Sequence, residues 1–169
     1  MKIALIVAGV LLVLVLGIVA IGAMLPKRHV VSRSASFKAS PENLFALIAG
    51  SQDWRPDVKS CEVFDEGGKQ FQRETSKHGE TVLYELQQSR PPTAIERRIA
   101  TGNLPYGGKW SLVLEPENGH TLVRFTEDGE VYNPFFRFMS RFVLGQTATL
   151  DAYLKAMGKA VGEDVQIVD

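Results

Sequence analysis

The sequence predicts an α+β domain in which an antiparallel sheet packs against a long C-terminal helix, preceded by one apolar helix. Apolar and polar residues alternate with period two in several segments, as in Val82/Tyr84/Leu86, which is typical of half-buried strands. A helical pattern follows Asn133-Pro134, a pair that suits an N-cap and a first helical position. Ile3–Leu25 contains no charged or strongly polar side chain. Together these segments predict a sheet with one covered face and one separate apolar helix.

The apolar segment is long enough to cross a bilayer. As a helix, Ile3–Leu25 would span about 34 Å, against a hydrocarbon core of about 30 Å. Lys2 precedes it, and Pro26-Lys27-Arg28 ends it. A cleaved signal peptide is the alternative, with Ala20-Ile21-Gly22 as its cleavage site, but signal peptides have apolar regions of about 7–15 residues. We therefore expect residues 1–28 to be a retained transmembrane anchor, which makes the protein a single-pass membrane protein.

The charges beside this segment bear on the side of the membrane. Lys2 and the α-amino group lie before it, and Lys27, Arg28, Arg33 and Lys38 lie after it. Basic residues favour the cytoplasmic side. The side of the soluble part stays open, with the cytoplasm slightly favoured.

Composition is ordinary for a globular protein, with 45% hydrophobic and 22% charged residues among 169. This length accommodates one domain, residues 29–169, after the anchor. Acidic and basic residues number 19 each. Without Lys2, Lys27 and Arg28 there are 19 − 3 = 16 basic residues against 19 acidic ones, a balance that argues against nucleic-acid binding. Cys61 is the only cysteine, so an intrachain disulfide is excluded.

The elements of this domain follow from alternation and capping. Val31–Phe37 alternates as a strand, and Ser40-Pro41 begins a short helix that Gly50 ends. Turn residues then separate six further candidate strands, which gives about seven in all. These six are Cys61–Asp65, Gln70–Ser76, Thr81–Gln88, Thr93–Thr101, Lys109–Glu115 and Thr121–Glu127. Apolar residues then recur at helical spacing from Asn133 to about Gly162, which predicts one long helix.

The order of local motifs over residues 30 to 162 resembles the START-like helix-grip superfamily (SRPBCC), in its polyketide cyclase/dehydrase and lipid-transport branch. The motifs are Ala39–Phe45, Asp53–Val58, Gly108–Trp110, Thr126–Val131, Asn133–Arg137 and Leu154-Lys155. The resemblance implies a curved sheet that grips a long C-terminal helix, with an apolar cavity between them in many members. Some members are aromatases, cyclases or dehydratases, others carry hydrophobic ligands, and others bind proteins, so the fold does not decide the function.

The search for catalytic groups gives no candidate. His29, His78 and His120 lack zinc-ligand spacing, and Cys61 has no recognisable partner. The glycine pairs Gly67-Gly68 and Gly107-Gly108 are isolated and indicate turns, not a phosphate loop. We therefore predict no metal site, no cofactor and no catalytic residue.

Strand phase and the resemblance together predict the residues that line the cavity. Arg97 is in phase with Ile95 and Ile99, and Arg73 with Phe71. Either arginine would anchor a ligand oxygen if that phase faces inward, or meet water if it does not. The expected cavity residues are Trp54, Phe71, Tyr84, Arg97, Tyr106, Trp110, Phe125, Phe136, Met139 and Val143.

Acidic residues separate a carrier from an enzyme. Glu85 and Glu127 would act as acids or bases only if burial perturbed them. We expect the cavity to contain no buried acid paired with a second titratable group. The favoured function is a membrane-tethered module that binds a hydrophobic small molecule or lipid. The alternatives are a cyclase- or dehydratase-like enzyme that uses the same cavity, and a protein-interaction module with a collapsed cavity.

One segment, Phe135–Leu144, is apolar on more than one side. A helix that covers a single sheet needs only one apolar face. This segment is therefore either deeply enclosed or in contact with the bilayer, as a second membrane contact beside the N-terminal helix.

Overall fold

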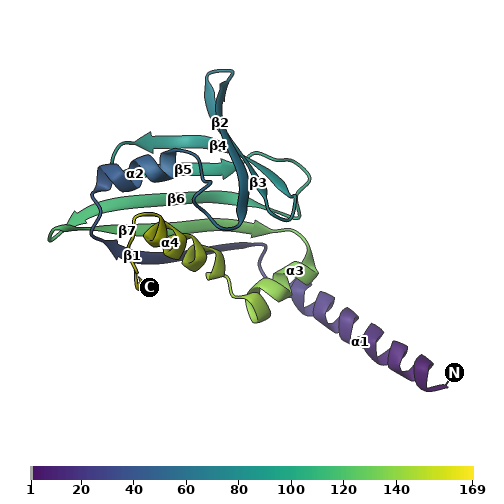
Figure 1. The fold of residues 1–169 in the computed structure, drawn as a ribbon. Coiled ribbons are helices and arrows are strands. Elements are labelled where there is room, and N and C mark those ends of the chain that lie inside the picture. Colours follow the sequence, from purple (N-terminus) through teal and green to yellow (C-terminus); the bar gives the residue numbers. More distant parts are fainter. Residues whose placement is uncertain (1) are drawn as a thin grey trace.

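The computed structural model describes residues 2–169 (Figure 1). Helix α1 (Lys2–Met24) projects away from a single domain built on an eight-stranded sheet. Every neighbouring pair of strands is antiparallel, in the order β2-β3-β4-β5-β6-β7-β1-β8. The strands are β1 (Arg28–Phe37), β2 (Val58–Glu66), β3 (Lys69–Ser76), β4 (Thr81–Arg90), β5 (Ala94–Ile99), β6 (Tyr106–Glu117), β7 (His120–Val131) and β8 (Ile167–Val168).

The predicted fold class is confirmed, because a curved antiparallel sheet lies against a C-terminal helix in the helix-grip arrangement. Each of the seven predicted strands is present. The eighth strand, β8, has only two residues, which pair with Ser34 and Ala35 of β1. So short a strand has no alternation from which to predict it.

The short helix α2 (Pro41–Ala49) begins and ends where its capping residues predict. The Ser40 hydroxyl accepts a hydrogen bond from the Asn43 amide at 3.3 Å, and Pro41 occupies the first turn. Leu44, Phe45 and Ile48 are buried against the sheet. Full burial of such side chains stabilises the fold by about 1.5–3 kcal/mol each.

The prediction of one uninterrupted helix from Asn133 to Gly162 is wrong. The segment divides into α3 (Pro134–Met139), a π-helical turn η1 (Ser140–Leu144) and α4 (Ala148–Ala160). Gly145 lies between η1 and α4, and its φ of 80° is outside the helical region. Because α3 packs against α1, the apolar periodicity of this segment reflects two different neighbours and not one helix surface.

Of the three parts of the C-terminal segment, only α4 lies across the concave face of the sheet, beside α2 (Figure 1). Its buried side chains include Leu150, Tyr153, Leu154 and Met157. They pack with Phe37 of β1 and with the inward side chains of α2, β6 and β7 in one core cluster. The grip is therefore formed by a helix of 13 residues.

The inward phase of β3 differs from the prediction by one residue. Gln72 and Glu74 are buried, and Glu74 pairs with Val82 across β4. Phe71 lies on the opposite face, where its ring stacks on Phe64 at 5.8 Å. Phe71 therefore does not line a cavity beneath the sheet. Phe71 lies directly opposite Phe64 in the β2–β3 pair, and the two rings cover each other on the outer face. An aromatic residue at this position therefore does not show which face of the strand is buried in the core.

Candidate ligand-binding site

An open cleft of about 360 Å³ lies at one end of the concave face. Strands β3, β4 and β6 form its wall, and the loop before β2 and the first turn of α4 form its rim. The lining side chains include Arg55, Asp57, Glu74, Glu80, Val82, Tyr84, Tyr106, Trp110 and Thr149. This volume falls at the lower end of the range for small-molecule sites, which is about 300–1,000 Å³.

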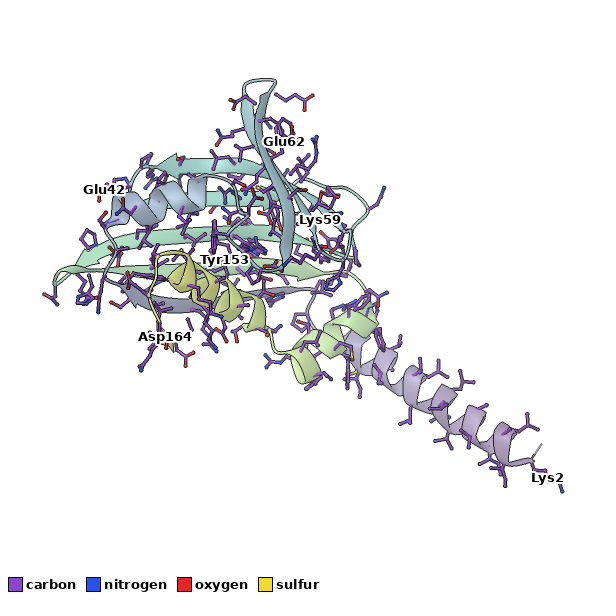
Figure 2. The ribbon with its side chains drawn as sticks, in the orientation of Figure 1. Lys2, Glu42, Lys59, Glu62, Tyr153 and Asp164 are labelled. Atoms are coloured by element: carbon purple, nitrogen blue, oxygen red, sulfur yellow. The ribbon has the colours of Figure 1, made fainter. Side chains whose placement is uncertain are left out.

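Aromatic rings connect this cleft to the core. The rings of Tyr84 and Trp110 are 5.4 Å apart, and Trp110 meets Phe125 edge-on at 5.6 Å. Tyr153 then contacts both Phe125 and Trp54, at 4.9 and 5.2 Å. In Figure 2, Tyr153 lies where α4 crosses in front of the sheet. The wall of the cleft is thus a rigid, largely aromatic surface.

A buried ion pair lies at the junction of the cleft and the core. Arg55 Nη1 donates to Glu74 Oε2 at 2.9 Å, and Arg55 Nη2 donates to Asp57 at 2.6 Å. The Arg55 guanidinium also lies 5.3 Å from the centre of the Tyr153 ring. A turn fixes this arginine, because the Arg55 amide donates to the Gln52 carbonyl and its own carbonyl accepts from Val58.

Burial controls the protonation of these groups. It raises the pKa of Glu74, although the Arg55 and Arg97 guanidinium groups oppose that rise. It lowers the pKa of Arg97, whose Nη2 donates to the Ile48 carbonyl at 2.6 Å. Burial, and then the Glu80 carboxylate, raise the pKa of Tyr106 to about 12. The cleft therefore holds one carboxyl group, Glu74, that binds a proton more readily than a solvated glutamate does.

The interior behind the cleft is nearly filled. Its cavity measures about 10 Å³, with Gln52, Arg97, Trp110 and Tyr153 among its walls. That volume is about what one water molecule requires. The expected roomy apolar cavity between sheet and helix is therefore absent from residues 2–169, because the Tyr153, Trp110 and Phe125 rings occupy that space. The larger space is the open cleft.

The ten predicted cavity residues separate into three groups. Tyr84, Tyr106 and Trp110 line the cleft, and Arg97 lies just beneath it. Trp54 and Phe125 support the wall through Tyr153, and Trp54 Nε1 donates to the Leu47 carbonyl. The remaining four, Phe71, Phe136, Met139 and Val143, lie away from the cleft, the last three in α3 and η1.

The cleft residues that the sequence analysis missed include Arg55, Asp57, Glu74, Glu80 and Thr149. The expectation that no buried acid would pair with a titratable group is wrong, because Glu74 pairs with Arg55. Gln72 and Glu74 are two residues apart and so share one face of the strand. That spacing could have predicted the buried face of β3, but the prediction assigned the inward face to Phe71 and Arg73 instead.

Glu85 and Glu127 both lie outside the cleft. Glu85 is on the outer face, where a hydrogen bond from Lys69 at 2.6 Å lowers its pKa. Glu127 accepts from His29 at 3.3 Å near α1, and burial raises its pKa. Arg73 is also on the outer face, paired with Glu62 at 2.6 Å. Among the predicted charged residues, Arg97 turns toward the core, and Glu127 lies on the same face of the sheet as Trp110, its partner across the β6–β7 pair.

Residues 28–162 match the polyketide cyclase / dehydrase and lipid transport family. The chain belongs to this family. No curated protein matches the sequence. Among residues 2–169, no group of three His, Cys, Asp or Glu side chains is placed to hold a metal ion.

Solved structures with the same fold are distant from this chain in sequence. A conserved protein from Geobacillus kaustophilus is 16% identical with a TM-score of 0.62, over 82% of this chain and 100% of that one. Protein XoxI from Bacillus cereus is 19% identical with a TM-score of 0.59, over 80% and 95%. Norcoclaurine synthase from Thalictrum flavum, solved with dopamine and hydroxybenzaldehyde, is 15% identical with a TM-score of 0.60, over 79% and 86%. At these identities the likeness establishes the fold alone.

Proposed function

We propose that this family member is a membrane-tethered binding module that takes a neutral or cationic amphipathic small molecule into the open cleft. The observation that supports this most is the meeting of an aromatic wall, Tyr84 and Trp110, with a rim of carboxylates. A flat apolar group would pack on the rings, and a hydroxyl, carbonyl or ammonium group would reach the polar rim.

The charges of the cleft restrict the ligand. Asp57, Glu74 and Glu80 line it, against Arg55 as the only basic residue in its lining. Arg55 is already paired with two of these carboxylates. An anionic ligand such as a fatty acid would therefore meet net repulsion, whereas a neutral or cationic one would not.

The tether is the second part of the proposal. Helix α1 is long and apolar enough to cross a membrane, and its apolar side chains are exposed rather than buried within the protein. A fully exposed apolar helix of this length is unstable in water, and a bilayer covers it. The cleft would then collect ligand close to the membrane surface.

Ligand uptake tests the cleft directly. We expect the full chain in detergent micelles to raise the fluorescence anisotropy of a neutral fluorescent sterol analogue. A fluorescent fatty acid should bind about tenfold more weakly, because of the carboxylates at the rim. Thr149→Trp should reduce uptake of the sterol analogue, since Thr149 is exposed at the rim and a large side chain there fills the cleft.

Lys155→Trp is the matched control, because Lys155 is exposed on the same helix and does not line the cleft. Uptake that is unaffected by Thr149→Trp, or equally reduced by both variants, would contradict the cleft as the site. Absence of uptake of either probe would favour a protein-interaction module instead.

A second candidate function is an enzyme of the cyclase or dehydratase type. One observation favours it: Glu74 is a buried carboxyl with a raised pKa that lines the open cleft. Such a group is suited to proton transfer to a bound ligand. It would protonate a departing hydroxyl, or remove a proton next to a carbonyl, with Arg55 positioning its carboxylate.

Mass analysis of the recovered ligand separates the two functions. A carrier releases its ligand unchanged, and Glu74→Gln leaves its affinity within a few fold. A dehydratase releases a product that has lost water, and Glu74→Gln abolishes the product while binding persists. Glu74→Gln is nearly isosteric, so it retains the shape of the site.

A further inference from the structure

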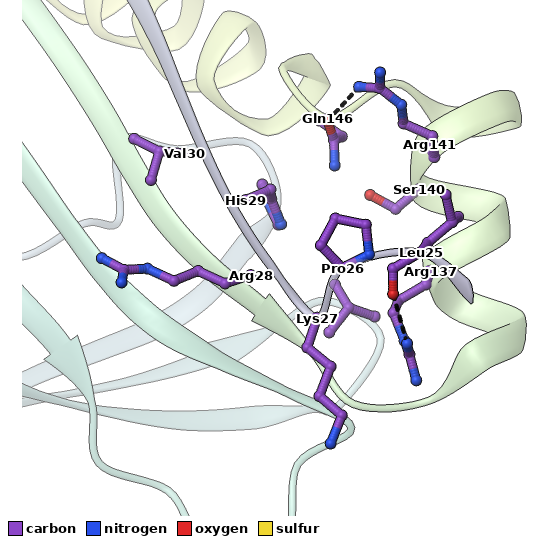
Figure 3. Close-up of a pocket in the computed structure, with 11 residues that line it drawn as sticks. Leu25, Pro26, Lys27, Arg28, His29, Val30, Arg137, Ser140, Arg141 and Gln146 are labelled. Atoms are coloured by element: carbon purple, nitrogen blue, oxygen red, sulfur yellow. Dashed lines mark hydrogen bonds between the residues drawn. The ribbon is translucent and has the colours of Figure 1, made fainter. Parts of the chain in front are cut away.

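A second pocket lies where α1 joins the domain. It has a volume of about 370 Å³ and is lined by the connection after α1 on one side and by α3 and η1 on the other (Figure 3). Basic and hydroxyl side chains are frequent in this lining, among them Lys27, His29, Arg137, Ser140 and Arg141. No residue of the proposed cleft lines this pocket.

Arg137 is the central cation of this pocket. Arg137 is only 8% exposed. Its Nη1 donates to the Leu25 carbonyl at 2.8 Å, and Nη2 donates to the Tyr132 carbonyl at 3.3 Å. Nε is buried and has no acceptor among residues 2–169. A buried guanidinium with only neutral carbonyl partners lacks the counter-charge that such groups normally have.

The neighbouring charges do not supply it. The nearby carboxylates are engaged elsewhere, Asp128 by Arg28 at 2.6 Å and Glu127 by His29 at 3.3 Å. Within residues 2–169, no carboxylate lies within ion-pair distance of Lys27, Arg137 or Arg141. Arg141 instead donates to the Gln146 side chain at 3.1 Å. Three cations therefore line one pocket, and none of them has a carboxylate partner among residues 2–169.

The place of this pocket relative to α1 identifies the anion. Gly22, in the last turn of α1, packs directly on Pro134 of α3. Since α1 is just long enough to cross the hydrocarbon core, its last turn lies near the level of the lipid headgroups. On the same side, α3 and η1 expose large apolar side chains: Phe135, Phe136, Phe142, Val143 and Leu144. A cationic pocket beside exposed aromatic residues is typical of a membrane interface.

We infer that this pocket binds the phosphate of an anionic phospholipid from the bilayer that α1 enters. The phosphate oxygens would accept from the Ser140 hydroxyl and the Arg141 guanidinium, and Lys27 and Arg137 would add positive charge. The exposed side chains of α3 and η1 would pack among the adjoining acyl chains. This inference rests on the tether in the proposed function and is independent of the cleft.

Native mass spectrometry of the full chain in detergent tests it. The lipid probes are dioleoylphosphatidylglycerol and dioleoylphosphatidylcholine. Each basic residue near an anionic lipid contributes about fivefold in affinity, so Lys27, Arg137 and Arg141 together predict about a 100-fold preference for phosphatidylglycerol. The double variant Lys27→Gln/Arg141→Gln should reduce this preference to about fivefold, and inorganic phosphate at millimolar concentration should not compete.

Arg124→Gln is the control, because Arg124 is an exposed arginine of β7 outside the pocket and outside every ion pair of residues 2–169. Equal binding of the two lipids by the wild type, or an undiminished preference in the double variant, would overturn the inference. Full competition by inorganic phosphate would overturn the lipid as its source. The spectrum also reports the chain mass, so loss of α1 by cleavage is seen separately, and sterol uptake by the double variant tests the cleft separately.

Discussion

Arg55 and Glu74 form an ion pair at 2.9 Å in which both side chains are about nine-tenths covered, at 9% and 10% exposure. The pair joins the loop before β2 to the concave face of β3, and it separates the open cleft from the filled core. Both charges lose water on burial, so the pair stabilises the fold only while both partners remain.

Removal of one partner should therefore destabilise the protein strongly. We expect Glu74→Ala to lower the free energy of unfolding by about 3 kcal/mol, because it leaves the buried Arg55 with Asp57 alone. The double variant Arg55→Met/Glu74→Leu should lose less than the single variant does, since it buries no charge. Thermal unfolding of the full chain in detergent measures both. A single variant as stable as the wild type would show that water reaches Arg55 freely.

The same pair predicts a pH dependence. Burial raises the pKa of Glu74 above its ordinary value of 4.5. At a pH between the pKa of Glu74 in the unfolded chain and its higher pKa in the folded protein, the folded protein binds more protons than the unfolded chain. The free energy of unfolding therefore falls as pH rises through this range. The pKa of Asp57 is lowered by the hydrogen bond from Arg55, despite partial burial, so Asp57 makes the free energy of unfolding rise with pH. Asp57 is present in both the wild type and the variant Glu74→Gln, so a comparison of the two isolates Glu74.

The difference between wild type and Glu74→Gln isolates the effect. The melting temperature of the wild type relative to Glu74→Gln should fall as pH increases from about 4.5 toward neutrality. A difference that rises over this range would mean that Arg55 and Arg97 outweigh burial and lower the pKa of Glu74.

Most of the fold was predictable from the sequence because the seven longer strands alternate and because two helices, α2 and α3, begin at capping residues. Ser40-Pro41 and Asn133-Pro134 both begin helices as predicted. The site was harder to predict. Phe71 is apolar yet packs on Phe64 outside the core. Glu74, on the opposite face of β3, is acidic yet buried, because it pairs with Arg55 from the loop before β2.

The C-terminal segment shows the same limit. Met139 and Val143 follow helical spacing, but their surroundings depend on where the chain bends at Gly145. Spacing along one helix cannot reveal that α3 leaves the sheet to pack on α1. The sequence could not decide whether Phe135–Leu144 is enclosed or meets the bilayer, because its surroundings depend on the contact of α3 with the end of α1, more than 100 residues away in the chain.

Gly22 should be required for the contact between α1 and α3. A Cβ atom at Gly22 would overlap the Pro134 carbonyl, so Gly22→Leu should separate α3 from α1 and expose Arg137. We expect trypsin to cleave after Arg137 about tenfold faster in this variant, because local opening exposes the bond. Gly17→Leu is the matched control, since nothing lies within 4 Å of its Cβ position. Equal cleavage of the two variants would contradict the docking of α3 on α1.

The proposed membrane anchor predicts how the chain fractionates. The full chain should remain with membranes after carbonate extraction, because transfer of an α1-length apolar helix into water is strongly unfavourable. Replacement of Leu12 and Leu14 by arginine should release the chain, since each central arginine costs about 2.5–3.5 kcal/mol on insertion. A mature chain that begins near Ala23 would instead establish cleavage of a signal peptide.

Paired tryptophan substitutions distinguish the cleft from the sequence-predicted cavity. Val143 was expected to line that cavity, so Val143→Trp would then block ligand uptake. The structure places Val143 at 60% exposure in η1, away from the cleft, whereas Thr149 is at the rim of the cleft. Val143→Trp should therefore leave uptake of the sterol analogue unchanged while Thr149→Trp reduces it about tenfold or more. Anisotropy titrations of both variants at one protein concentration measure this difference. The reverse order, with Val143→Trp the more harmful, would mean that η1 closes over the ligand and that the open cleft is not where it binds.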